Sequence, residues 1–176
     1  MDARDIHFYI DDRPHDGIFR VHRAVYTDAA IFEMEIERIF NRSWNFLAIE
    51  SEIARPNDFV TRYIGRTPVI VTRDSHGQIH TFINACRHKG ATVCRLEQGN
   101  ARYHVCPYHG WRWSLDSENR YVHDAVDFPG LTRDELRLPE CAIDTFAGFI
   151  FVRPEKDGPT LREHLAPVIA LLEPYH

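Results

Sequence analysis

The sequence predicts a mainly β protein with antiparallel strands and one helix near each end. Short runs rich in β-branched and aromatic residues fill the middle of the chain, and turn signals such as Gly65, the DSHG at 74–77 and Gly99-Asn100 separate them. The 176 residues are 44% hydrophobic and 27% charged, a composition that suits one globular domain with its own core.

The first predicted element is an amphipathic helix over residues 28–42. Apolar side chains recur there at spacings of two to four, and Thr27 or Asp28 is placed to cap the helix. We assign residues 1–43 to an amino-terminal arm and helix, whose apolar stripe is expected to pack on the domain. The stripe consists of Ile31, Phe32, Met34, Ile36, Ile39 and Phe40.

The main domain is predicted to span residues 44–155 and to be built from short β-strands. The runs that predict strands are WNFLAI (44–49), DFVTRYI (58–64), TPVIVTR (67–73), QIHTFIN (78–84), NARYHVC (100–106) and FAGFIFV (146–152). A second, short helix is predicted after them, because Thr160 and Glu163 form a capping box ahead of apolar residues at helical spacing.

Composition also disfavours several classes of protein. The net charge of -5 argues against nucleic acid as the main partner. No apolar run approaches the ~18 residues of a membrane helix, and the stretch MDARDIHFYI lacks the apolar centre of a secretory signal. We therefore expect a cytoplasmic protein without a membrane segment, whose four cysteines are metal ligands or buried thiols rather than disulfides.

Two short motifs each combine a thiol with an imidazole. NACRHKG contains Cys86 and His88, and CPYHGWRW contains Cys106 and His109, which gives C-x-H, seventeen residues, then C-x-x-H. Two thiolates and two imidazoles suit either a tetrahedral zinc site or an iron–sulfur cluster with mixed ligands. A zinc finger groups Cys with Cys and His with His, whereas each of these motifs supplies one of each. The alternation favours a two-iron cluster with chemically different ends.

CRHKG followed by CPYHGW resembles the cluster-binding signature of Rieske [2Fe–2S] domains, in particular of the large (alpha) subunit of aromatic-ring-hydroxylating dioxygenases. The segments YTDAAIFEMEIERIF, WNFLAIESEI and YIGRTPVIVTRD are similar to the benzoate, anthranilate and salicylate oxygenase branch. The resemblance implies a Rieske-type antiparallel β-sandwich with a cluster-binding loop subdomain at about residues 84–113. It also implies that Cys86 and Cys106 bind one iron of the cluster, and that His88 and His109 bind the other.

Residues next to the motifs refine this prediction. Rieske proteins of respiratory complexes carry a disulfide-forming cysteine in each loop, and Ala91 and Tyr108 hold those positions here. The resemblance therefore favours a low-potential electron carrier. Gly90 and Gly110 follow the motifs, and we expect them to let backbone N–H groups approach the sulfurs.

Other conspicuous residues are given structural roles. Cys94 and Cys141 are predicted to be buried small hydrophobic residues, because neither has a histidine at matching spacing. Of Trp111 and Trp113, one is expected to shield the loops and the other to join the β core. Four further histidines are predicted to be exposed or hydrogen-bonded residues of ordinary strands and loops. These are His76, His80, His104 and His123.

One absent motif bears on the reaction. In the resembling family, oxygen is activated at a mononuclear Fe(II) held by two histidines and a carboxylate in a catalytic domain after the Rieske domain, and this chain has no D-x-x-H-x4-H motif. We therefore expect no catalytic residue in this chain, and we expect residues 156–176 to begin the connection to a catalytic domain that the chain lacks.

The expected function is electron transfer from a reductase or ferredoxin to the catalytic domain of the same or a neighbouring large subunit. The resemblance also implies trimeric assembly and a small beta subunit. Two alternatives remain, a free-standing Rieske ferredoxin and a zinc-stabilised interaction module. Colour separates the zinc module from the other two, because zinc proteins are colourless and a two-iron cluster absorbs visible light.

Overall fold

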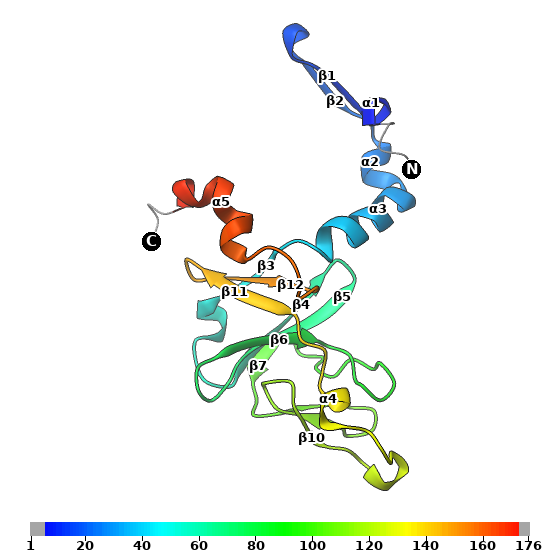
Figure 1. The fold of residues 1–176 in the computed structure, drawn as a ribbon, viewed down its shortest axis with the longest axis vertical. Coiled ribbons are helices and arrows are strands. Elements are labelled where there is room, and N and C mark those ends of the chain that lie inside the picture. The colour runs from blue at the N-terminus through cyan, green and yellow to red at the C-terminus, as the bar shows by residue number, and fades with distance from the viewer. Residues whose placement is uncertain (1–5, 173–176) are drawn as a thin grey trace. The chain divides into compact units, whose positions relative to one another are not determined.

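The computed structural model describes residues 6–172, which divide into two compact units between Ile39 and Phe40. The first unit contains one two-stranded sheet, and the second contains three further sheets among the residues described (Figure 1). Every strand pair in these sheets is antiparallel, as predicted.

The first unit is a hairpin followed by helices. Its elements are α1 (Ile6–Tyr9), β1 (Ile10–Arg13), β2 (Ile18–Val21), α2 (Ala24–Thr27), α3 (Ala29–Glu35) and the π-helix Ile36–Phe40, which runs into the second unit. The Asp28 carboxylate accepts hydrogen bonds from the N–H groups of Ala30 and Ile31 at 2.8 and 3.3 Å, so the predicted cap of the first helix is confirmed. The packing of its apolar stripe stays a prediction.

The second unit is built on two main sheets. One has the strand order β6-β5-β4-β7 and the other β11-β12-β3. The bounds are β3 (Asn45–Ile49), β4 (Asp58–Ile64), β5 (Thr67–Arg73), β6 (Ile79–Ile83), β7 (Gln98–Asn100), β11 (Ala142–Phe146) and β12 (Phe149–Arg153). A smaller sheet, β10-β9-β8, consists of β8 (His104–Val105), β9 (Arg112–Trp113) and β10 (Asn119–Tyr121). Figure 1 places this small sheet and α4 (Arg133–Leu136) at one end of the unit and α5 (Leu161–Leu172) at the other.

The central strands β4 and β5 separate two hydrophobic cores. Successive side chains on a strand point to opposite faces, so Val60 and Val69 enter the core between the two main sheets, while Phe59 and Ile70 enter a second core. The second core lies against the loops that carry the Cys and His motifs. Its other members are Phe82, Cys86, Val93, Cys94, Cys106, Trp111, Trp113 and Leu138.

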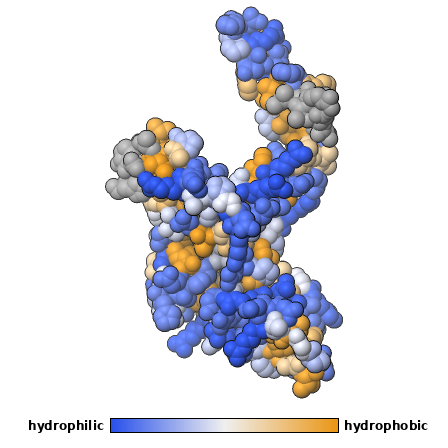
Figure 2. All heavy atoms as spheres, viewed as in Figure 1, coloured by the Kyte–Doolittle hydropathy of each residue, from blue (hydrophilic) through white to orange (hydrophobic). Residues whose placement is uncertain are grey.

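Helix α5 (Leu161–Leu172) begins at the predicted capping box. The Thr160 hydroxyl accepts from the Glu163 N–H at 3.2 Å, and the Glu163 carboxylate accepts from the Thr160 N–H at 2.8 Å, so this prediction is confirmed. Among residues 6–172 no helix has the length and apolar character needed to cross a membrane. On the face of the second unit that Figure 2 shows, polar side chains predominate, and one of the apolar groups lies over the loop between β10 and α4, where Val126 and Leu131 are exposed.

Candidate metal centre

The two motifs form loops with the same backbone pattern. In each loop the cysteine N–H donates to the carbonyl oxygen five residues later, and the glycine four residues after the cysteine donates back to the cysteine carbonyl. The bonds are Cys86 to Ala91 and Cys106 to Trp111, both 2.8 Å, with Gly90 to Cys86 at 2.8 Å and Gly110 to Cys106 at 3.0 Å. Strand β6 leads into the first loop and β8 into the second, so sheet pairing fixes where both loops begin.

The two loop glycines have left-handed backbones. Gly90 has a φ of 70° and Gly110 a φ of 71°, a region that other residues occupy only at a cost. Their own N–H groups bond to the carbonyl oxygens of Cys86 and Cys106. A backbone N–H group does lie near a sulfur, as expected from the sequence, because the His88 N–H is 3.4 Å from Cys86 Sγ.

The imidazoles of His88 and His109 face one another. Their Nδ1 atoms are 3.1 Å apart, and the ring centroids are 4.6 Å apart. Two nitrogens bound tetrahedrally to one metal ion, each at about 2.1 Å, would lie about 3.4 Å apart. The pair therefore fits a common metal ion with little movement. Burial lowers the pKa of His88, and the neighbouring His109 and Lys89 lower it further, which favours the neutral imidazole that binds metals.

The thiols of Cys86 and Cys106 form a second, deeper pair. Both residues are buried in the core that the loops share with β4 and β5, whereas both histidines are half-buried. Burial raises the pKa of the Cys86 thiol, and the adjacent Cys106 raises it further. A metal ion between the sulfurs would reverse this preference, because ligating cysteines are thiolates.

Aromatic side chains enclose the histidine pair. Trp111 stacks on His88 with ring centroids 4.9 Å apart and ring planes 9° apart. Phe128 meets the rings of His88 and Trp111 edge-on. Tyr108 stacks on His109 with centroids 3.8 Å apart and is 62% exposed. The buried Trp111 and the partly buried Phe128 therefore cover His88, while the exposed ring of Tyr108 stacks on His109.

The tryptophans take the two roles predicted for them. Trp111 shields the loops, and Trp113 is fully buried in the core, where its Nε1 donates to the Leu136 carbonyl at 2.9 Å.

Sequence reasoning missed Asn84, which is buried and holds the segment after the first motif. Its Oδ1 accepts from the N–H groups of Val93 and Cys94 at 3.0 and 2.9 Å, and its Nδ2 donates to the Cys94 carbonyl at 2.7 Å. Its place at the end of a predicted strand gave no signal of this role.

His104 differs from its prediction. It is 3% exposed, its Nε2 has no hydrogen-bond partner, and its ring lies 5.0 Å from Phe59 and 6.0 Å from Phe82. Burial lowers its pKa to about 4. The prediction of an exposed or hydrogen-bonded residue was therefore wrong. Since His104 lies two residues before the buried Cys106, the period of a strand already placed both side chains on one face.

The other residues noted in the sequence lie apart from the two pairs. Cys94 and Cys141 are buried and free, as predicted, and burial raises the pKa of Cys141 to about 12. His80 and His123 contact Asp74 and Asp124 at 2.9 and 3.1 Å, and His76 is exposed. Within residues 6–172 no group of three or more Cys, His, Asp or Glu side chains is placed to hold a metal ion. The four candidate ligands come together as one sulfur pair and one nitrogen pair.

Comparison with known proteins supports the predicted family resemblance and the fold. A family model described as the Rieske [2Fe-2S] domain matches residues 43–129. The chain is 38% identical over 147 residues to the biphenyl 2,3-dioxygenase subunit alpha of Rhodococcus jostii, covering 83% of this chain and 32% of that protein. It is 39% identical over 171 residues to the 2-halobenzoate 1,2-dioxygenase large subunit of Burkholderia cepacia, covering 93% and 36%.

A solved structure supports the fold. Naphthalene 1,2-dioxygenase with indole bound in the active site superposes with a TM-score of 0.82 at 35% identity, covering 89% of this chain and 36% of that chain. The predicted resemblance and fold class are confirmed. The chain spans about a third of the length of the relatives it matches.

Proposed function

Because residues 43–129 of this chain belong to the Rieske [2Fe–2S] domain family, we propose that its function is electron transfer through a cluster held by the two residue pairs. Cys86 and Cys106 would hold the buried iron, and His88 and His109 the iron nearer the surface. When bound, such a cluster takes up and releases one electron at a time. The observation that carries this proposal is the approach of the two histidine Nδ1 atoms to 3.1 Å above a pair of buried thiols.

The protein's own residues would set the working conditions of the centre. Cys86 and Cys106 belong to the core that the loops share with β4 and β5, so they would hold the inner end of the centre in place. Trp111 and Phe128 exclude water from His88, while Tyr108 covers His109 from outside. Neutral histidines in place of two thiolates remove negative charge, which raises the potential from about -400 mV for an all-cysteine plant-type cluster toward about -150 mV or higher.

The wider role proposed for the chain follows from its relatives, which are large or alpha subunits of dioxygenases. We propose that a reductase or ferredoxin supplies electrons, and that they pass to a mononuclear Fe(II) in a catalytic domain of the same or a neighbouring large subunit. An aromatic substrate, a trimeric assembly and a small beta subunit belong to this proposal. So does a cytoplasmic location, which the four free cysteines support.

Metal and sulfide analysis of the purified chain tests the proposal. We expect a red-brown protein with about two irons and two sulfides per chain and the electron paramagnetic resonance signal of a mixed-ligand cluster. Cys86→Ser and His109→Ala should lose the visible absorbance, whereas Cys94→Ser and Cys141→Ser should keep it. Stoichiometric zinc without iron, in protein expressed with adequate iron, would favour the zinc-stabilised module instead.

A further inference from the structure

The segment that carries the candidate ligands differs in charge from the rest of the chain. Residues 86–113 contain five arginines and lysines and one acid, so the segment carries +4, whereas the whole chain carries -5 and the remaining residues -9. The cations are Arg87, Lys89, Arg95, Arg102 and Arg112, and the acid is Glu97. Positive charge is therefore concentrated around the centre of an otherwise acidic protein.

Three of these cations have no carboxylate partner among the described residues. In the part of the chain that the structure describes, Arg95, Arg102 and Arg112 are exposed and have no carboxylate within ion-pair distance. The nearby carboxylate of Glu118 is already paired, since it contacts Arg120 at 2.8 Å and Arg137 at 3.1 Å. The three free guanidinium groups are consequently available to a partner.

The exposed ring of Tyr103 connects these three arginines. Arg112 lies over Tyr103 at 5.7 Å and over Tyr121 at 5.8 Å, in the geometry of a cation–π contact. Arg102 and Tyr103 line one pocket, and Arg95 and Tyr103 line another. We call the surface formed by Arg95, Arg102, Arg112, Tyr103 and Tyr121 the basic patch.

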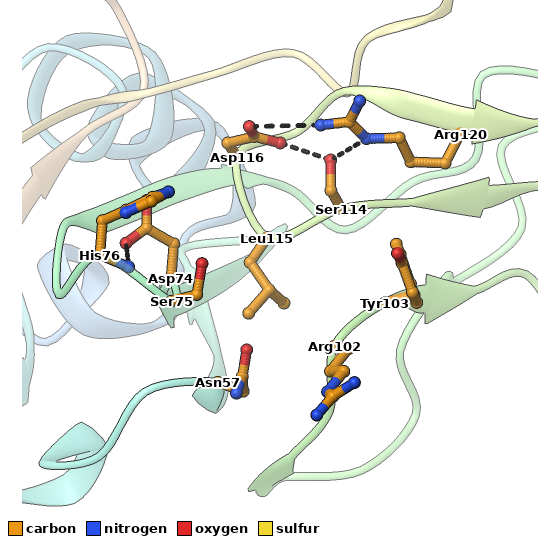
Figure 3. Close-up of a pocket in the computed structure, with 10 residues that line it drawn as sticks. All are labelled: Asn57, Asp74, Ser75, His76, Arg102, Tyr103, Ser114, Leu115, Asp116 and Arg120. Atoms are coloured by element: carbon orange, nitrogen blue, oxygen red, sulfur yellow. Dashed lines mark hydrogen bonds and ion pairs between the residues drawn. The ribbon is translucent and has the colours of Figure 1, made fainter.

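The pocket beside Arg102 has a volume of about 550 Å³ and lacks a free acid of its own (Figure 3). Of its two carboxylates, Asp74 accepts from the backbone N–H groups of His76 and Gln78 at 2.8 and 2.9 Å. Asp116 accepts from the Ser114 hydroxyl and is 3.8 Å from Arg120. Arg102 therefore lines a hollow whose two carboxylates already have other partners.

The basic patch adjoins the candidate centre along the chain. Arg112 directly follows Trp111, which stacks on His88, and it pairs across the small sheet with Val105, the neighbour of Cys106. Arginine and tyrosine, together with tryptophan, are enriched among the residues that dominate binding at protein interfaces. An acidic protein seated here would lie within a few residues of both ligand loops.

We propose that the basic patch is the docking surface for an acidic electron-transfer protein, with Arg112 between its two tyrosines as the main contact and Arg102 receiving a carboxylate. The inference rests on the proposed electron-transfer function and adds the surface and the charge of the partner. In the encounter one electron leaves the reduced partner, which is oxidised, and reduces the centre held by this chain. Opposite charges accelerate such encounters and make them sensitive to salt.

Stopped-flow reduction of the cluster-loaded 176-residue chain tests the docking surface, with reduced plant-type [2Fe–2S] ferredoxin as the acidic donor and dithionite as a small donor. We expect Arg112→Glu and Arg102→Glu each to slow reduction by ferredoxin at low salt by about tenfold or more. Arg112→Gln should lie between wild type and Arg112→Glu. The rate with the wild-type chain should fall steeply as ionic strength rises.

Arg162→Glu is the matched control, because Arg162 is exposed on α5, at the opposite end of the unit, and the charge change is the same (Figure 1). It should leave the ferredoxin rate within about twofold of wild type, and dithionite should reduce all variants alike. Equal effects of Arg112→Glu and Arg162→Glu, or a rate independent of salt, would overturn the docking surface. Tight binding of duplex RNA that the patch variants abolish, without any effect on ferredoxin, would overturn it too. A chain that holds no cluster or that dithionite cannot reduce would instead contradict the proposed function itself.

Discussion

His104 should make the stability of this protein fall in mild acid. The imidazole is buried between Phe59 and Phe82 with Nε2 unpartnered, and burial lowers its pKa from 6.5 to about 4. The unfolded chain therefore binds a proton at this site more readily than the folded chain. The contribution of neutral His104 to the free energy of unfolding is fully present above pH 6.5 and is lost as the pH falls toward 4.

The size of the effect follows from the pKa difference. At about 1.4 kcal/mol per pKa unit, the full shift corresponds to about 3 kcal/mol, of which about 2 kcal/mol is lost between pH 7.5 and pH 5. His104→Phe removes the titrating nitrogen and keeps an aromatic ring against Phe59 and Phe82. Between pH 7.5 and pH 5, we expect the free energy of unfolding of the variant to fall by about 2 kcal/mol less than that of the wild type.

Urea unfolding of the cluster-loaded chain at pH 7.5, 6.5, 5.5 and 5.0, followed by tryptophan fluorescence, measures this difference. His123→Phe is the matched control, because His123 is exposed and the substitution is the same, and it should keep the wild-type slope. An identical pH dependence in the wild type and His104→Phe would refute the reasoning. The His104 ring would then be hydrated or paired in solution.

Three further outcomes follow from other residues. Cys141 should resist iodoacetamide at pH 8 until the protein unfolds, because burial raises its pKa to about 12; rapid alkylation of the native protein, read by mass spectrometry, would contradict this. Gly110→Ala should lower the free energy of unfolding by about 1–2 kcal/mol and lower the iron content, because φ is 71° in a ligand loop. Gly77→Ala, at a φ of 84° in a hairpin away from the loops, should lower the free energy of unfolding similarly but leave the iron content unchanged. Trp111→Leu should speed bleaching of visible absorbance by a chelator several-fold, because Trp111 covers His88; an unchanged bleaching rate would show that the ring does not protect the site.

Much of the second unit could be predicted from local signals. Strands β3 to β6 lie within a residue of the predicted runs, because each run is long, β-rich and bounded by a turn. Both helix starts were also predictable, since Asp28 and the pair Thr160 and Glu163 satisfy backbone groups within a few residues of themselves. In these cases the signals that indicate the local structure are close together in sequence, although the strands also pair with distant ones.

The elements that the sequence missed or predicted with other bounds depend on partners elsewhere in the chain. Strand β8 keeps only two residues of the predicted run NARYHVC, and the two-residue strand β9 was not predicted. These two strands pair with one another around the second ligand loop. The hairpin of β1 and β2 contains IDDR, a charged run without alternation. Asn84 is similar, because its bonds reach to Val93 and Cys94 across a loop whose path no local pattern specifies.

The candidate ligands could be identified, but their arrangement in depth could not. Motif spacing gave Cys86, His88, Cys106 and His109 without stating which pair is buried. Strand β5 decides this, because its Val69 and Val71 side chains face one core and its Ile70 side chain faces the other. The loops pack on the Ile70 side, so their first residues, the cysteines, enter the core and the histidines that follow lie nearer the surface. A substitution that disturbs the Ile70 face should therefore affect the buried sulfur pair directly and the nitrogen pair only through the loops.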